Sequence, residues 1–384
     1  MDNSYDTKHL KVLDGIRALA ILIIVWYHFW QQNWISPTIG SFSIDYIPRY
    51  GYLLVDMMIL ISGFCLFIPY ARAMVYKDKM PKMKDFYIKR IARIVPSYYL
   101  ALIIFFIFWL LGRGIFNGFF FKDTIMHLLF VHNWSSDTLL YTCFNGVLWT
   151  VAIEVQFYLI FPFIAKMFTK KPIITYVIMM AMGIFCTWII KSNVTSNNLS
   201  FYVNHFLTFI PVFANGILAS WLYMLYTKKK KRNIITDLLF MIMSISCIMV
   251  YCYLVKHIGS ENIQVWQLNN RILLSIVFTV FIISTLLSSR IYQKIFNNPF
   301  MKYICVISFN LYIYHQFIAV KLKEYRIPYY SGDIPPNMTG DTKWQWTYFI
   351  LCIVISLIVA SIITYFFEKP MANLIKKKFI IEKS

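Results

Sequence analysis

Long apolar runs dominate the chain, and short polar or basic segments separate them. A run of about 20 apolar residues can cross the ~30 Å hydrocarbon core of a bilayer as a helix. Runs of this length cover residues 14–31, 50–70, 96–115, 147–168, 172–190, 205–226, 234–255, 271–289, 303–322 and 347–367. The pattern predicts an all-α, polytopic membrane protein with about ten transmembrane helices.

The composition agrees with lipid as the main solvent. Of 384 residues, 59% are hydrophobic and 14% are charged, and the mean hydropathy of +0.60 is far from that of ordinary soluble domains. Because no hydrophilic stretch is long enough for a separate soluble domain, the sequence predicts one transmembrane domain over residues 1–384 without an appended extracytoplasmic domain. The first run contains Asp14, Arg17 and His28 and lacks a small-residue cleavage site, so we interpret it as a retained span.

The net charge of +20 could indicate a nucleic-acid partner or an anionic membrane surface. The positions of the cations decide between these two. Of 37 Lys and Arg residues, 26 lie in the N-terminal segment, the C-terminal segment and every second connection. Basic residues collect on the cytoplasmic side of membrane proteins, so both termini are predicted to be cytoplasmic. The run 228–232 is then a topology signal, the expected partner is the lipid bilayer, and no nucleic acid is predicted.

The seven cysteines give no sign of a disulfide framework. They form no CxxC pair, and no histidine stands beside them at the spacing of metal ligands. The sequence therefore predicts no metal site.

Charged side chains inside a span are costly and mark functional candidates. In the first span, Arg17 and His28 are 11 residues apart, which is close to three full helical turns. They therefore share one helix face, with Arg17 near the predicted cytoplasmic end and His28 roughly 16 Å further toward the outer side.

Two carboxylates are expected at the depth of His28. Asp56 in the second span and Glu154 in the fourth lie similar distances below the outer surface. A carboxylate that orients an imidazole strengthens it as a base, so the three side chains could form an acid/base cluster. The alternative is that each is a structural polar group that joins helices. For His28 with two carboxylates at its depth, we favour a catalytic function.

The connection before the third span carries a pair of arginines. Arg90 and Arg93 are three residues apart and would share a helix face, where two guanidinium groups suit phosphate binding. The alternative, that they only reflect the cytoplasmic bias of basic residues, remains open at this point.

At these residues the sequence resembles the membrane-bound acyltransferase 3 family. The resemblance is carried by segments of this chain in the order that the family shows: LDGIRALAILIIVWYH at 13–28, VDMMILISGFCL at 55–66, FYIKRIARIVPSYYL at 86–100, LWTVAIEVQFYLIFP at 148–162, ISFNLYIYHQF at 307–317 and FEKP at 367–370. One departure is Val155, where many members carry a second glutamate, so that Glu154 alone would inherit the acidic role.

The resemblance implies a membrane-bound O-acyltransferase of the bacterial cytoplasmic membrane. It would transfer an acyl group, usually acetyl, from cytoplasmic acetyl-CoA to a hydroxyl of a surface polysaccharide or its lipid-linked precursor. Arg17, Arg90 and Arg93 would bind the CoA phosphates. The resemblance also makes His28 the catalytic histidine, with Glu154 in support.

Asp56, Ser62 and His315 fall in matched segments with less defined roles, and we count Asp56 among the catalytic candidates. His28 would act as a general base or as a transient acyl carrier. The rival function is a proton-coupled transporter or flippase of lipid-linked glycans. The broken helices and internal repeats expected of many transporters are not evident in the sequence. A purely structural scaffold would have no use for charges at one depth in three spans.

Overall fold

A computed structural model describes residues 5, 10–112, 114–194, 198–259 and 262–379. Within these ranges, ten helical segments are long and apolar enough to cross a membrane, which confirms the predicted polytopic fold. Their helices are α1 (Lys11–Asn33), α3 (Leu54–Tyr76), α4 (Met83–Leu111), α7 (Trp149–Lys170), α8 (Pro172–Asn193), α10 (Ile210–Lys229), α11 (Ile234–Lys256), α12 (Ile263–Leu287), α14 (Pro299–Glu324) and α16 (Thr342–Ile363).

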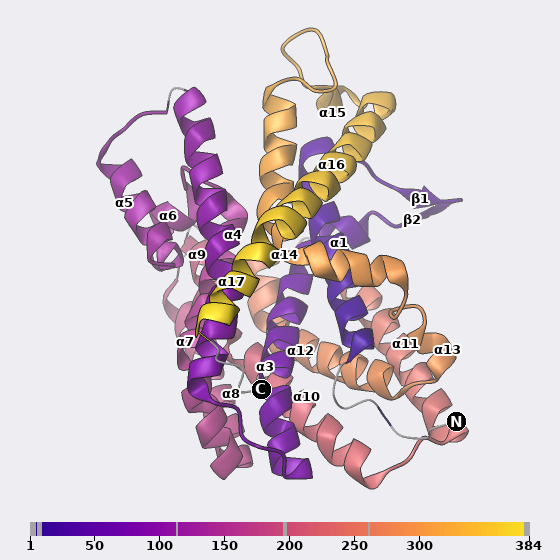
Figure 1. Cartoon of the computed structure of the whole chain (residues 1–384). Coiled ribbons are helices and arrows are strands. Elements are labelled where there is room, and N and C mark those ends of the chain that lie inside the picture. The colour runs from indigo at the N-terminus through magenta and orange to yellow at the C-terminus, as the bar shows by residue number, and fades with distance from the viewer. Residues whose placement is uncertain (1–4, 6–9, 113, 195–197, 260–261, 380–384) are drawn as a thin grey trace.

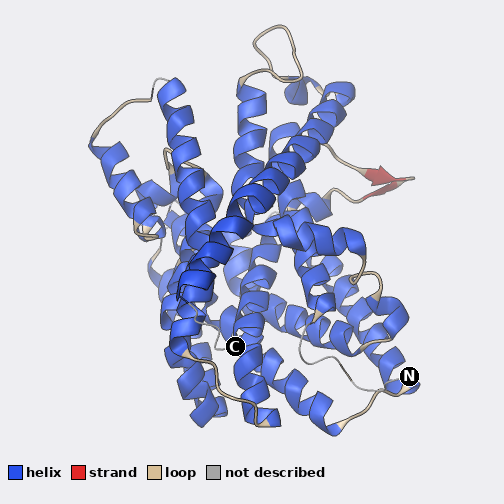
Figure 2. Cartoon of the chain, viewed as in Figure 1, coloured by secondary structure: helices blue, strands red, loops and turns tan. Residues whose placement is uncertain are grey.

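Short elements fill the connections (Figure 2). An antiparallel hairpin of β1 (Thr38–Ile39) and β2 (Phe42–Ser43) projects from the bundle after α1. The connection 111–146 contains the short helix α5 (Gly118–Leu128). The remaining short elements are α2 (Tyr46–Arg49), η1 (Gly51–Leu53), η2 (His132–Trp134), α6 (Ser136–Leu140), η3 (Gly146–Leu148), α9 (Leu199–Val203), η5 (Phe206–Phe209), α13 (Arg290–Gln293) and α15 (Pro336–Thr339).

Two spanning helices begin well before their apolar runs. Helix α4 starts at Met83, so Pro96 lies inside the helix. Helix α12 starts at Ile263, where the side chain of Asn262 accepts the backbone N–H groups of the first turn. Hydropathy detects only the part of a helix that lipid surrounds, whereas a solvated or capped turn can extend the helix beyond it. Arg271, which the apolar pattern places at the border of a span, therefore lies inside α12.

Helices α3 and α10 form the most extensive helix pair of the bundle. Two glycines allow their backbones to approach closely, as small residues do between membrane helices. A Cβ atom added at Gly216 would lie 2.1 Å from the carbonyl oxygen of Leu60, and one added at Gly63 would lie 2.6 Å from that of Phe213.

Helix α1 lies between α3 and α14, and α14 in turn packs against α16. Helix α16 continues through the π-helix η6 (Thr364–Glu368) into α17 (Lys369–Phe379), and together they form the long yellow helix that crosses the bundle in Figure 1. The side-chain amide of Asn310 on α14 donates to Thr364 Oγ1 at 2.9 Å and to Glu368 Oε2 at 2.6 Å. These two bonds hold α14 against the π-helix.

A buried polar cluster anchors the connection that contains α5. Asp123 Oδ1 lies 3.0 Å from His127 Nδ1, while its Oδ2 accepts from Thr142 Oγ1 and from the backbone N–H of Cys143. The rings of His127 and His132 stack with their centroids 3.8 Å apart. Burial, together with the neighbouring His127, holds the pKa of His132 well below its usual range, so its ring is neutral at neutral pH.

The close contact of α3 and α10 gives a testable expectation. Gly216→Ala should lower the thermal unfolding midpoint of the detergent-purified protein, because the added methyl group meets the backbone of Leu60; overpacking of this kind costs about 1–3 kcal/mol. Gly118→Ala is the matched control, since a Cβ atom there has no neighbour within 4 Å. Equal midpoints for the two variants would contradict the tight packing.

Candidate active site

Two cavities open inside the bundle and follow one another along α1. The inner cavity encloses about 760 Å³ of empty space, part of it open to solvent. Its polar lining comes from five helices: Arg17 on α1, Ser62 on α3, Arg93 on α4, Thr150 and Glu154 on α7, and Ser308 on α14. Because Arg17 and Arg93 belong to the predicted cytoplasmic ends of their helices, this cavity is on the predicted cytoplasmic side.

The outer cavity is larger, with about 1520 Å³ of empty space, and it has a more polar wall. His28 and Asp56 both line it. Aromatic rings and side-chain amides make up much of the remaining wall, contributed by Tyr27, Trp30, Tyr50, Tyr52, Trp149, Gln31, Asn204, Gln264 and Gln267.

The two cavities meet at Val55 and Tyr312, which line both of them. Ile24 lines the inner cavity and His28, one helical turn further along α1, lines the outer one. The Arg17–His28 face predicted from the sequence therefore runs along both cavities. Its histidine is close to the place where they touch.

A second histidine contacts His28. Nε2 of His315, on α14, lies 2.9 Å from Nδ1 of His28. His315 is fully buried and His28 is half-buried. The ring centroids are 4.8 Å apart and the planes are inclined by 60°.

The neighbours of the pair determine its tautomers. Nδ1 of His315 faces the carbonyl oxygens of Leu311 at 3.0 Å and Tyr312 at 2.7 Å, and since a carbonyl can only accept, this nitrogen carries the proton. In a neutral ring Nε2 then accepts, so His28 Nδ1 donates to it. The carbonyl of Ile24, 3.1 Å from His28 Nδ1, agrees with this assignment. The lone pair of His28 is therefore on Nε2, the usual form of a general base or nucleophile.

Asp56 has a partner of its own. Its Oδ2 lies 3.1 Å from Nε of Arg271 on α12, and both side chains are buried. Nη1 of Arg271 also donates to the carbonyl of Val203 and to Thr208 Oγ1. Oδ1 of Asp56 and Nη2 of Arg271 are buried without a hydrogen-bond partner. Sequence reasoning missed Arg271, because it is the first residue of the apolar run 271–289. The hydropathy pattern gave no sign that the helix begins earlier, at Ile263.

Glu154 lies at the inner cavity and not beside His28. It accepts a short hydrogen bond from Tyr158 and one of 3.4 Å from Ser62 Oγ. The expected layer of three acidic and basic groups is thus divided: Asp56 shares the outer cavity with His28, and Glu154 shares the inner one with Arg17 and Arg93. The expectation that a carboxylate orients His28 is corrected, since His315 holds that position. The position of His315 inside the apolar run 303–322, in one of the segments that resemble the family, was the signal that could have revealed this partner.

The two arginines of the predicted phosphate-binding pair are not equivalent. Arg93 lines the inner cavity. The guanidinium group of Arg90 lies over the ring of Tyr158, 5.3 Å from its centroid, and over that of Phe86. Arg90 is therefore not among the residues that line the inner cavity. It contacts Tyr158, whose hydroxyl donates to Glu154 in the cavity wall. Within the described ranges no three His, Cys, Asp or Glu side chains gather as a metal site would require.

Comparison with known proteins agrees with the resemblance carried by the motifs. The family model described as an acyltransferase domain matches residues 10–366. No solved structure matches the chain.

Curated relatives match over nearly the whole chain. The O-acetyltransferase OatA of Staphylococcus aureus strain NCTC 8325 / PS 47 is 24% identical over 385 residues, which cover 97% of this chain and 58% of the relative. A putative O-acetyltransferase, SACOL0978, of Staphylococcus aureus strain COL is 25% identical and covers 94% of this chain and 57% of the relative. The chain thus spans less than two thirds of the length of these relatives.

The ion pair of Asp56 and Arg271 leads to a prediction about stability. Arg271→Met leaves a buried carboxylate unpaired, which costs about 3–5 kcal/mol, whereas replacing both members of such a pair by apolar residues is often neutral. We expect a large drop in the thermal unfolding midpoint for Arg271→Met and recovery of most of it in Asp56→Leu/Arg271→Met. A double variant as unstable as the single one would contradict the pairing.

Proposed function

The chain belongs to the acyltransferase-domain family, and on that premise we propose that it is a membrane-bound O-acetyltransferase. It takes an acetyl group from acetyl-CoA on the cytoplasmic side and delivers it to a hydroxyl of a surface polysaccharide, or of its lipid-linked precursor, on the outer side. It acts as a multi-pass protein of the bacterial cytoplasmic membrane.

One observation carries this proposal: two cavities meet at Val55 and Tyr312, and His28 lines the outer one beside that meeting point. A thioester that reaches up from the inner cavity and a hydroxyl that reaches down from the outer cavity would come together near His28. Neither substrate then has to cross the membrane as a whole.

The inner cavity has the groups that a CoA donor needs. Arg17 and Arg93 line it and supply two cations for phosphates or for the polar pantetheine arm. About 16 Å of helix separates Arg17 from His28, on the order of the length of an extended pantetheine arm. Glu154, held by Tyr158 and Ser62, lies between these ends and can accept hydrogen bonds from the amides of the arm.

His28 would act through Nε2. As a general base it takes the proton of the acceptor hydroxyl while the oxygen attacks the thioester carbonyl, the C–S bond breaks, and the proton passes to the departing CoA thiolate. As an acyl carrier the same nitrogen would attack the thioester carbonyl, hold the acetyl group as an acyl-imidazolium and release CoA as the thiolate. The acceptor hydroxyl would then attack the acetyl carbonyl, the C–N bond would break to free His28, and the hydroxyl proton would pass to the thiolate. In both routes His315 keeps the proton on Nδ1 of His28 and thereby leaves Nε2 free to react.

The outer cavity suits a sugar. The rings of Trp30 and Trp149 offer flat apolar faces, and the side chains of Gln264 and Gln267 offer donors and acceptors for hydroxyl groups. Asp56 lines this cavity as well.

Separate replacement of His28 and of His315 tests the proposed chemistry. His28→Ala should abolish acetyl transfer, since a positioned base contributes about 10²- to 10⁴-fold. His315→Ala should lower kcat while the KM for acetyl-CoA stays nearly constant, because it orients the base and does not touch the donor. His315→Gln, whose amide oxygen can accept from His28 Nδ1, should retain more activity than His315→Ala.

The measurement uses purified protein in proteoliposomes, acetyl-CoA, and the glycan fraction of a deletion strain as acceptor, with mass spectrometry of the product. Equal amounts of folded protein are confirmed by size-exclusion chromatography. Substantial acetylation by His28→Ala would overturn the assigned role. Equal activities of His315→Gln and His315→Ala would remove the orienting role of His315.

The donor site is tested through the arginines. Arg93→Gln should raise the KM for acetyl-CoA severalfold with a smaller effect on kcat, because it removes a cation from the cavity wall. Arg90→Gln should raise this KM less, since it acts through Tyr158, and Lys89→Gln is the control on the exposed side of the same helix. An unchanged KM for Arg93→Gln would exclude it from the donor site.

A further inference from the structure

A third cavity lies away from both parts of the candidate active site, at the predicted cytoplasmic end of the bundle. It encloses about 930 Å³ of empty space, part of it open to solvent, and shares no lining residue with the other two. Four cations line it: Lys11 at the start of α1, Arg232 before α11, Arg290 on α13 and Lys294 just after α13. None of the described residues that line it is acidic.

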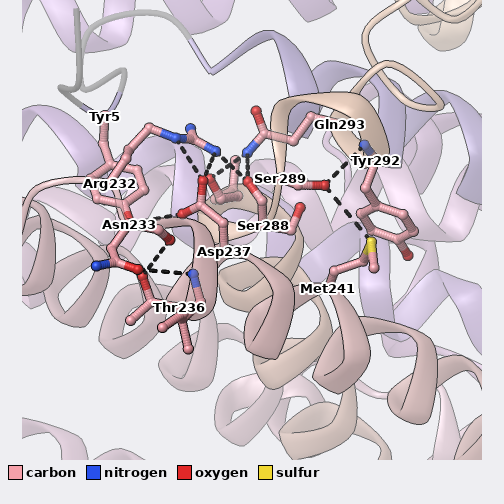
Figure 3. A network of polar contacts seen from close by, with 12 residues as sticks. Tyr5, Arg232, Asn233, Thr236, Asp237, Met241, Ser288, Ser289, Tyr292 and Gln293 are labelled. Atoms are coloured by element: carbon pink, nitrogen blue, oxygen red, sulfur yellow. Dashed lines mark hydrogen bonds and ion pairs between the residues drawn. The ribbon is translucent and has the colours of Figure 1, made fainter.

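Arg232 is fixed in place, as Figure 3 shows. Its side chain is 10% exposed, and Nε and Nη2 bind Asp237 Oδ2 at 3.1 and 3.0 Å. Nη2 also donates to the carbonyl of Ser288. The hydroxyl of Tyr5 donates to the other oxygen of Asp237, and the guanidinium group lies over the ring of Tyr5. A basic residue that serves only as a topology signal needs no such support.

The wall beside Arg232 is also rigid, since Gln293 donates to the same Ser288 carbonyl. The side-chain amide of Gln293, which lines the cavity, donates to the carbonyl oxygens of Thr285, Leu286 and Ser288 at the end of α12 (Figure 3). Carbonyl groups at the end of a helix otherwise lack partners. This cap fixes the end of α12 relative to α13. The backbone of Lys294, which follows α13, is therefore held at a defined distance from Arg232, which binds the end of α12.

The lining is amphipathic. Leu10, Val12 and Leu286 give it an apolar part next to the cations. Lys11, Arg290 and Lys294 are exposed, and all four cations lie at the ends of spanning helices or in the connections beside them, where the predicted orientation puts the cytoplasmic membrane surface. Basic pockets between helices on this side of a membrane suit anionic lipid headgroups.

We propose that this cavity binds the phosphate group of an anionic phospholipid of the cytoplasmic leaflet. Lys11 and Lys294 would approach the phosphate from solvent, Arg232 would contact it from the buried side, and the glycerol and first methylene groups would cover the apolar part. A soluble phosphate compound shares the charge but gains nothing from that part, which is why the lining favours a lipid. The proposal does not depend on the proposed acetyl transfer.

The test compares two double variants of the full chain in neutral detergent. Lys11→Gln/Lys294→Gln removes two cations from the cavity, and Lys229→Gln/Lys231→Gln removes two exposed lysines from the same face outside it. Each protein is titrated with phosphatidylglycerol, with phosphatidylcholine, and with inorganic phosphate. Thermal unfolding midpoints and the number of lipids retained in native mass spectrometry are the readouts.

Phosphatidylglycerol should raise the midpoint of the wild type and of the control variant more than phosphatidylcholine does. The apparent affinity of Lys11→Gln/Lys294→Gln for phosphatidylglycerol should fall on the order of tenfold or more, since each basic residue near an anionic lipid adds to the binding free energy. If inorganic phosphate alone raises the midpoint as much as phosphatidylglycerol does, and the cavity variant loses this rise, the cavity binds a soluble phosphate and the lipid proposal is overturned. An equal loss in both double variants, or none in either, would overturn the proposal. The midpoints without lipid confirm that each variant is folded.

Discussion

Hydrocarbon offers no partner for a hydrogen bond, so each polar side chain carried into the bundle must be satisfied by another helix or by a cavity. This constraint accounts for the arrangement around α1. Asp56 on α3 is paired with Arg271 on α12, and His28 on α1 with His315 on α14. These contacts join helices that are far apart in the sequence. They also hold His28 and Asp56 in the wall of the outer cavity, where a substrate could contact them.

The sequence predicts the framework well because lipid acts on hydropathy directly. The number of spans and the shared face of Arg17 and His28 both follow from runs of apolar residues and from helical geometry. Helix ends are less accessible to this reasoning. The start of α12 depends on the cap by Asn262, and the start of α4 on a basic turn that solvent can surround.

Partnerships across the bundle are the part that sequence reasoning could not supply. The depth of the side chains in the membrane would allow His28 to contact Asp56 or Glu154. Which partner it contacts depends on the rotation of each helix about its axis and on which helices are neighbours. Packing places α14 beside α1 and so brings His315 to His28, while Arg271 on α12 reaches Asp56. The same limit applies to Arg90 and Arg93, which share a helix but differ in their access to the cavity.

The meeting of the two cavities at Val55 and Tyr312 has an electrical consequence. Two solvent-open cavities that meet inside the bundle confine most of the membrane potential to a short distance, much shorter than the ~30 Å of the surrounding hydrocarbon. Moving one elementary charge across the potential requires about 2.3 kcal/mol per 100 mV, whereas a neutral acetyl group passes without electrical work. In the proposed transfer, a passage that admits an acetyl group but no ions would allow acetylation on the outer side without discharging the membrane.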